Sequence, residues 1–133
     1  MTSTVVYEGD LRTTCTHLKS GNSFITDAPT DNNGKGEAFS PTDTVATALA
    51  SCILTVMGIK ARDMDANIDG ASAKITKTMA SDPRRISKIA IAFCFPNPVS
   101  DKEKKILENV ARTCPVHHSL HPDIEKDITF EWA

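Results

Sequence analysis

Two cysteines in this chain occupy positions where a thiol could do chemistry. Cys52 lies inside a long uncharged stretch, and Cys114 stands just before Pro115 at an expected helix junction. A thiolate is a strong nucleophile, but cysteine is also among the most often buried residue types, so each position has a packing interpretation too. The local sequence favours packing for Cys52 and leaves Cys114 balanced between the two. Cys15 and Cys94 lie in strand-like segments and are interpreted as packing residues.

A cation and several imidazoles could assist such a thiolate. Arg12 stands at the start of an expected strand, either as a solvated edge residue or as a cation presented to a thiolate or an oxyanion. On a continuous helix, Cys114 would share one face with a set of three histidines, which are His117, His118 and His121. Zinc accepts thiolate and imidazole ligands together. The segment is short and bounded by prolines, so we expect surface histidines beside a functional cysteine and no metal site.

A long helix is expected in the middle of the chain. Ser40 is a good N-cap, Pro41 suits the first helical position, and Asp43 places negative charge at the positive end of the helix dipole. The residues that follow are apolar on nearly every side, which predicts a central buried helix ending near Arg62 or Asp63. Because a thin one-sheet domain could not cover such a helix alone, we expect a second copy to bury part of it in a two-fold dimer.

The remaining segments predict an α+β protein. Strands are expected at 4–8, 11–18, 23–27, 71–79, 87–95 and 127–132, and further helices at 100–113 and 116–120. Strands and helices do not alternate in β–α–β units, so a mostly antiparallel sheet is expected. A length of 133 residues suits one domain spanning residues 1–133.

Composition excludes several classes of partner. The formal net charge is -2 and basic residues are interleaved with acidic ones, so we expect neither nucleic acid nor a membrane surface as a partner. The uncharged stretch is shorter than the roughly 20 apolar residues of a membrane span. The N-terminal residues do not have the pattern of a signal peptide, so a cytoplasmic location is expected. The four cysteines should then stay mostly reduced.

Two sequence patterns occur together in one order. Ser40–Asp43 begins the apolar helix that carries Ala50–Cys52, and Thr113–Val116 follows after a hairpin and a second helix. In this order and spacing the patterns resemble the OsmC/Ohr family of thiol-dependent peroxidases. The resemblance covers nearly the whole chain and is closest to the OsmC-like branch.

The resemblance implies both a fold and an activity. The fold would be OsmC-like, with antiparallel sheets packed around a long buried central helix in an intertwined homodimer. Cys52 would attack an organic hydroperoxide, with hydrogen peroxide as a further substrate, and Cys114 would resolve the resulting sulfenic acid as a disulfide. A thiol reductant, such as a lipoylated protein, would reduce that disulfide. The family needs no metal and no organic cofactor.

Two positions depart from the family pattern. Arg12 is the implied cation, but it follows Gly-Asp-Leu where the Ohr arginine follows Gly-Gly. The glutamate that holds this arginine in the family is replaced by Thr42, and an acid comes one residue later as Asp43. Arg12 and Asp43 are therefore candidate site residues beside the two cysteines. The departures keep an alternative open, in which the protein is a non-enzymatic redox sensor or binds a small ligand.

Overall fold

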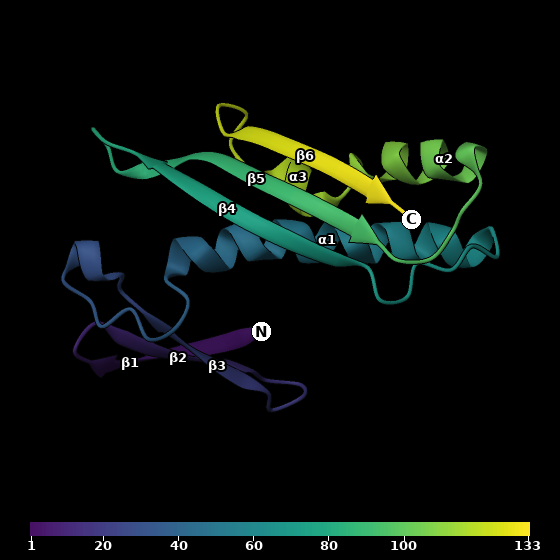
Figure 1. Ribbon diagram of the computed structural model, residues 1–133. Helices are drawn as coiled ribbons and strands as arrows, with labels where there is room; N and C mark the ends of the chain where they lie inside the picture. Colours follow the sequence, from purple (N-terminus) through teal and green to yellow (C-terminus); the bar gives the residue numbers. More distant parts are fainter. The chain divides into compact units, whose positions relative to one another are not determined.

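The computed structural model describes all residues from 1 to 133, which form two compact units, Met1–Val45 and Ala46–Ala133. Each unit contains one three-stranded sheet, and helix α1 begins in the first unit and continues in the second (Figure 1). This mixture confirms the α+β class. The expected single domain over residues 1–133 stays a prediction.

The first unit is an antiparallel sheet in the order β1-β2-β3. Its strands are β1 (Ser3–Gly9), β2 (Arg12–His17) and β3 (Ser23–Asp27), and a short 3-10 helix, η1 (Thr30–Asn32), follows. The turn between β1 and β2 holds Asp10 and Leu11 at φ of 52° and 63°, the left-handed backbone that two-residue hairpin turns require. All three predicted strands are confirmed.

Helix α1 (Pro41–Asp63) starts at the predicted cap. The Ser40 hydroxyl accepts a hydrogen bond from the Asp43 backbone N–H at 3.1 Å, and the Asp43 carboxylate accepts one from the Ser40 N–H at 2.9 Å. This reciprocal pair is a capping box with aspartate in the usual place of glutamate. Asp43 thus helps to fix where α1 begins.

One face of α1 is buried within the chain. The buried residues are Ala46, Leu49, Ala50, Ile53, Met57 and Ala61. On the other side Val45 and Ile59 keep 38% and 61% of their surface exposed.

By length and composition α1 is also apolar enough to cross a membrane, contrary to our expectation from the uncharged stretch alone. That criterion is weak evidence, because the core helix of a soluble protein meets it as well.

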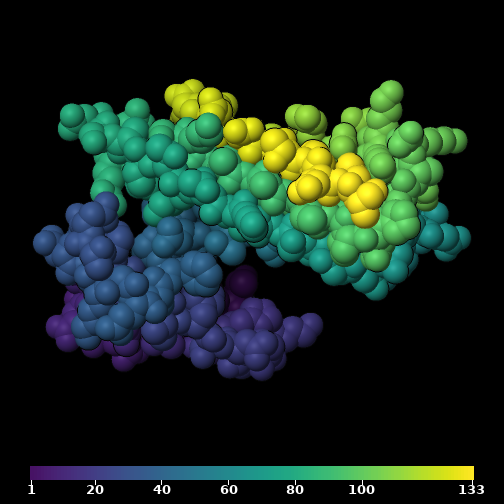
Figure 2. Space-filling view, in the orientation of Figure 1, coloured from purple at the N-terminus to yellow at the C-terminus, as the bar shows by residue number.

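The second unit is a sheet in the order β4-β5-β6, accompanied by helices. Its elements after α1 are β4 (Ser72–Ala80), β5 (Arg85–Phe95), α2 (Asp101–Ala111), α3 (Pro115–Ser119) and β6 (Glu125–Trp132). The predicted β4–β5 hairpin and the Ser100–Glu103 capping box of α2 are both confirmed. Figure 2 shows β6 along the surface of this unit, next to β5.

The strand pairs are mostly antiparallel, as expected, and the exception is β6, which pairs with β5 in parallel. Parallel neighbours need a long crossover connection, and α2 and α3 lie in the segment that connects β5 to β6. The apolar alternation of β6 marks its buried face but carries no information on its direction.

The core of the second unit lies between the sheet and the helices. Phe93 and Phe95 of β5 are 1% exposed, and Phe130 of β6 stacks on Phe93 with ring centroids 5.6 Å apart. Trp132 stacks on Phe95 at 4.0 Å. The buried face of α1 belongs to the same cluster, together with Cys114. The core therefore positions one of the two candidate cysteines directly.

Candidate active site

Cys114 is the N-cap of the five-residue helix α3, as its place before Pro115 predicted. Its sulfur accepts a hydrogen bond from the backbone N–H of His117 at 3.2 Å. The residue is 0% exposed and belongs to the hydrophobic core. Cys114 is thus held in a single place by packing from the core and by capping from α3.

Burial decides the protonation of Cys114. Loss of solvent raises the pKa of its thiol, and the nearby Cys52 side chain raises it further. Hydrogen bonds from the backbone N–H groups of His117 and Val116 lower the pKa, but they do not outweigh burial. Of the two interpretations that the sequence left open for Cys114, the burial is that of a packing residue, and capping of α3 does not lower the pKa of the thiol overall. A helix of five residues has too few aligned peptides to compensate for the lost hydration.

Cys52 lies on α1, next to Cys114. It is partly buried and packs against the core cluster that contains Cys114. Its side chain is close enough to raise the pKa of Cys114 through hydrogen bonding and charge. Both cysteines are free thiols. The structure thus brings together, within the second unit, the two thiols that the sequence patterns selected.

Arg12 lies in the first unit and is held by two carboxylates. Its guanidinium donates to both oxygens of Asp27, from Nε at 2.7 Å and from Nη2 at 2.8 Å, and Nη2 also donates to Glu37 at 3.1 Å. Asp27 is 1% exposed and accepts a further bond from the Glu37 N–H at 3.2 Å. Hydrogen bonding keeps the pKa of Arg12 above its ordinary value, so the side chain is a fixed cation.

Sequence reasoning missed Asp27 and Glu37 as partners of this arginine. A signal for Asp27 existed in the strand pairing, because the β2–β3 register places Arg12 directly opposite Asp27. Opposite charges on directly paired residues of antiparallel strands stabilise each other. Asp43, the carboxylate that the family pattern suggested, lies at the cap of α1.

Asp27 makes the stability of the chain sensitive to acid. Hydrogen bonding from Arg12 lowers the pKa of Asp27 below its ordinary 3.8, against the opposing effect of burial. A depressed carboxyl pKa stabilises the fold above the unfolded-state value, and this contribution is lost as pH falls through the folded-state value. We expect Asp27→Asn to lower the melting temperature at neutral pH and to flatten its dependence on pH below about 4.

Thermal unfolding from about pH 2 to about pH 7 measures this effect. Glu37→Gln is the matched control, because its carboxylate is 66% exposed and its loss should change the melting temperature far less. Equal pH profiles for wild type and Asp27→Asn would contradict the role of the Arg12–Asp27 pair.

The histidines do not form the single face that a continuous helix would give. Helix α3 ends at Ser119, so His121 lies beyond it, where its Nδ1 accepts a bond from the Asp123 N–H at 3.0 Å. No group of three or more His, Cys, Asp or Glu side chains has an arrangement that could hold a metal ion. His117 remains beside Cys114 through its backbone.

The packing interpretation is wrong for Cys94. It is exposed, because it follows the inward-facing Phe93 on a strand whose side chains alternate. Cys15 is partly buried.

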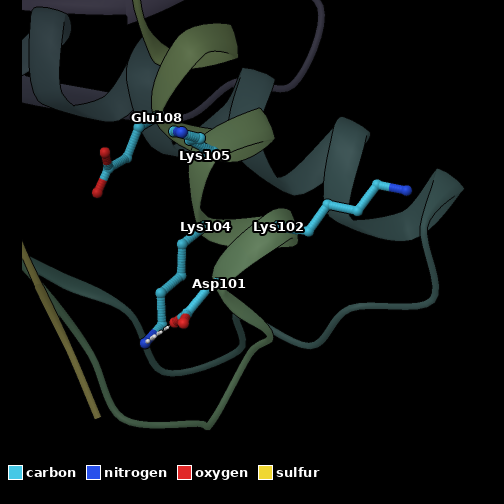
Figure 3. Close-up of a pocket in the computed structure, with 5 residues that line it drawn as sticks. All are labelled: Asp101, Lys102, Lys104, Lys105 and Glu108. Carbon is cyan, nitrogen blue, oxygen red and sulfur yellow. Dashed lines mark ion pairs between the residues drawn. The ribbon is translucent and has the colours of Figure 1, made fainter.

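The structure also has a charged surface recess of about 500 Å³ on α2, lined by Asp101, Lys102, Lys104, Lys105 and Glu108 (Figure 3). That recess contains none of the predicted site residues.

Comparison with known proteins identifies the family. The family model for OsmC-like proteins matches residues 34–129, more than half of the chain. The solved structure of a provisionally named osmotic stress induced and detoxification response protein from Psychrobacter arcticus is 57% identical, with a TM-score of 0.96 over 98% of this chain and 96% of that one. No curated protein sequence matches significantly. The chain belongs to the OsmC-like protein family.

Two more distant structures share the fold. An OsmC-like protein from Mycoplasma pneumoniae is 19% identical, with a TM-score of 0.82 over 98% of this chain and 95% of that one. An organic hydroperoxide resistance protein OsmC from Legionella pneumophila is 12% identical, with a TM-score of 0.76 over 98% and 97%. These two comparisons show the OsmC-like fold, and the family supports a redox or stress-response role.

Proposed function

We propose that this protein is a thiol-dependent peroxidase that reduces organic hydroperoxides and, as a further substrate, hydrogen peroxide. The observation that carries the proposal is the pair of free thiols, Cys52 and Cys114, held together in the second unit. Membership of the OsmC-like family supports it, as does the description of a structural neighbour as an organic hydroperoxide resistance protein.

The two thiols divide the chemistry between them. Cys52, as a thiolate, attacks the terminal oxygen of the hydroperoxide, the O–O bond breaks, and an alkoxide leaves and is protonated to the alcohol. Cys52 then carries a sulfenic acid. Cys114 attacks that sulfur, which forms a Cys52–Cys114 disulfide and releases water. An external dithiol, such as a lipoylated protein, reduces the disulfide and is itself oxidised to a disulfide.

The partial burial of Cys52 suits the attacking role, because a small peroxide must reach it. The complete burial of Cys114 suits the resolving role, because it keeps this thiol away from peroxide in bulk solvent. On the family resemblance, we further propose Arg12 as the cation of the active site, with its guanidinium held by Asp27 and Glu37. Asp43 is proposed to act by capping α1, the helix that carries Cys52.

We also propose a homodimer that functions in the cytoplasm. Several large apolar side chains of the first unit are more than half exposed, among them Val5, Val6, Tyr7 and Phe39. Exposed apolar surface of this extent is typical of an interface between copies. We expect sedimentation equilibrium to give twice the 14.4 kDa mass of one chain. A monomer at micromolar concentration would contradict the dimer.

The test of the proposed activity is hydroperoxide consumption by the reduced protein. We expect stopped-flow mixing with cumene hydroperoxide to show oxidation far faster than that of free cysteine, and repeated turnover when a dithiol is supplied. Oxidation at the rate of free cysteine, without turnover, would instead favour the non-enzymatic sensor.

A further inference from the structure

His117 is tied to the sulfur of the resolving cysteine through its backbone. Its N–H donates to Cys114 Sγ at 3.2 Å, and the residue occupies the third position of α3. The Cα–Cβ bond of a helical residue tilts toward the helix N-terminus, and side chains at this position reach back to the N-cap residue in capping boxes. The backbone of His117 is thus bonded to Cys114 Sγ, and proton transfer to the imidazole requires its ring to rotate toward that sulfur.

The surroundings of His117 favour a neutral imidazole. Partial burial lowers its pKa from the ordinary 6.5, and the nearby cations lower it further. The charged neighbours are Lys126 of β6 and Arg112 at the end of α2, and the adjacent ring of His118 in α3 also lowers the pKa of His117. Near neutral pH the ring thus has one free nitrogen to accept a proton and one N–H to donate.

The attack by Cys114 needs a group that accepts the proton of its thiol. Burial raises the pKa of its thiol, so at neutral pH it is protonated and cannot attack as it stands. Releasing a bare thiolate inside the core would also be costly, because a buried charge without a partner loses its hydration. The resolving step requires a path for the proton of Cys114 that creates no isolated charge.

We propose that His117 carries the proton of Cys114 while the disulfide with Cys52 forms. One imidazole nitrogen takes the proton as the Cys114 sulfur bonds to the sulfur of the Cys52 sulfenic acid. The S–O bond breaks, its electron pair leaves with the oxygen, and that oxygen receives a proton from the imidazole and departs as water. The Cys114 thiol is oxidised, the sulfenic sulfur is reduced to the disulfide level, and the imidazole ends unchanged. This inference rests on the proposed peroxidase function.

Single-turnover oxidation of His117→Asn tests the inference, since asparagine is polar but cannot accept the proton. One equivalent of hydroperoxide is added, and samples are quenched with dimedone, which labels sulfenic acid, for mass spectrometry. At pH 7 we expect disulfide formation to be about 100-fold slower, with an unchanged rate of sulfenic acid formation. His121→Asn is the matched control, because this exposed histidine lies beyond α3, and both of its rates should equal those of wild type.

The pH profile separates proton transfer from a structural effect. In wild type the rate of disulfide formation should fall as pH drops through the His117 pKa, which lies below 6.5, because the protonated ring cannot accept a proton. In His117→Asn the inflection at this pKa should be absent, and only the dependence on the small thiolate fraction of Cys114 should remain. The backbone N–H that caps Cys114 remains in any variant, and His117→Gln provides a second variant should His117→Asn unfold.

The outcomes are distinguishable. Disulfide formation in His117→Asn at the wild-type rate and with the wild-type pH profile would overturn the role of His117 and leave the peroxidase intact. Sulfenic acid that accumulates in wild type without disulfide would also overturn it. If wild type forms no sulfenic acid, the proposed function fails, and the role of His117 falls with it.

Discussion

Cys52→Ser is expected to abolish hydroperoxide-dependent turnover. A serine hydroxyl is nearly the same size as a thiol, so the packing of α1 should be kept, but it is not a nucleophile toward peroxide oxygen. Removal of an attacking group costs several orders of magnitude, and we expect a loss of at least about 10³-fold. Stopped-flow consumption of cumene hydroperoxide with a dithiol reductant measures the effect.

Cys94→Ser is the matched control for this experiment. Cys94 is an exposed free thiol, so it would react first if accessibility alone decided reactivity. Cys94→Ser should keep wild-type turnover. A Cys52→Ser protein that consumes hydroperoxide as fast as wild type would rule out Cys52 as the attacking residue, and an inactive Cys94→Ser protein would contradict the assignment of the activity to Cys52 and Cys114 alone.

Cys114→Ser is expected to separate the two halves of the cycle. The first oxidation of Cys52 should proceed at the wild-type rate, but no internal disulfide can follow. The sulfenic acid then persists and is oxidised further to sulfinic acid, which thiols do not reduce. We expect turnover with a dithiol to fall at least about tenfold and to decline with each addition of hydroperoxide. Mass spectrometry of the intact protein follows the added oxygen atoms.

The Cys114→Ser protein should fold normally. Serine is a preferred N-cap residue, so its hydroxyl can accept the His117 N–H in place of sulfur. An unchanged melting temperature would therefore show that a loss of turnover is chemical. Stable wild-type turnover in this variant would exclude Cys114 as the resolving residue.

The sequence predicted the elements better than their directions. Helix α1 was located by Ser40, Pro41 and Asp43, and α2 by its capping box, because helix ends have local requirements that particular side chains meet. The buried faces of β5 and β6 followed from alternating apolar residues. The parallel direction of β6 could not be predicted, since alternation looks the same in both directions.

Only part of the candidate site could be predicted from the sequence, for a similar reason. The cysteine pair was selected by two ordered motifs, whereas local sequence alone favoured packing for Cys52. The environment of Cys114 depends on burial by residues distant in sequence, so its raised pKa was not foreseen. Asp27 is 15 residues from Arg12, and only the strand register makes them neighbours.

The distribution of aromatic residues provides an optical probe for the second unit. The chain has one tryptophan and one tyrosine. Trp132 stacks on Phe95 in the second unit, and its indole N–H donates to Glu108 at 2.8 Å, whereas Tyr7 lies in the first unit. Tryptophan fluorescence can therefore follow denaturation of the second unit by itself, and far-ultraviolet circular dichroism of the same sample follows the whole chain. Coincident transitions define one cooperative folding unit, and separated transitions define two.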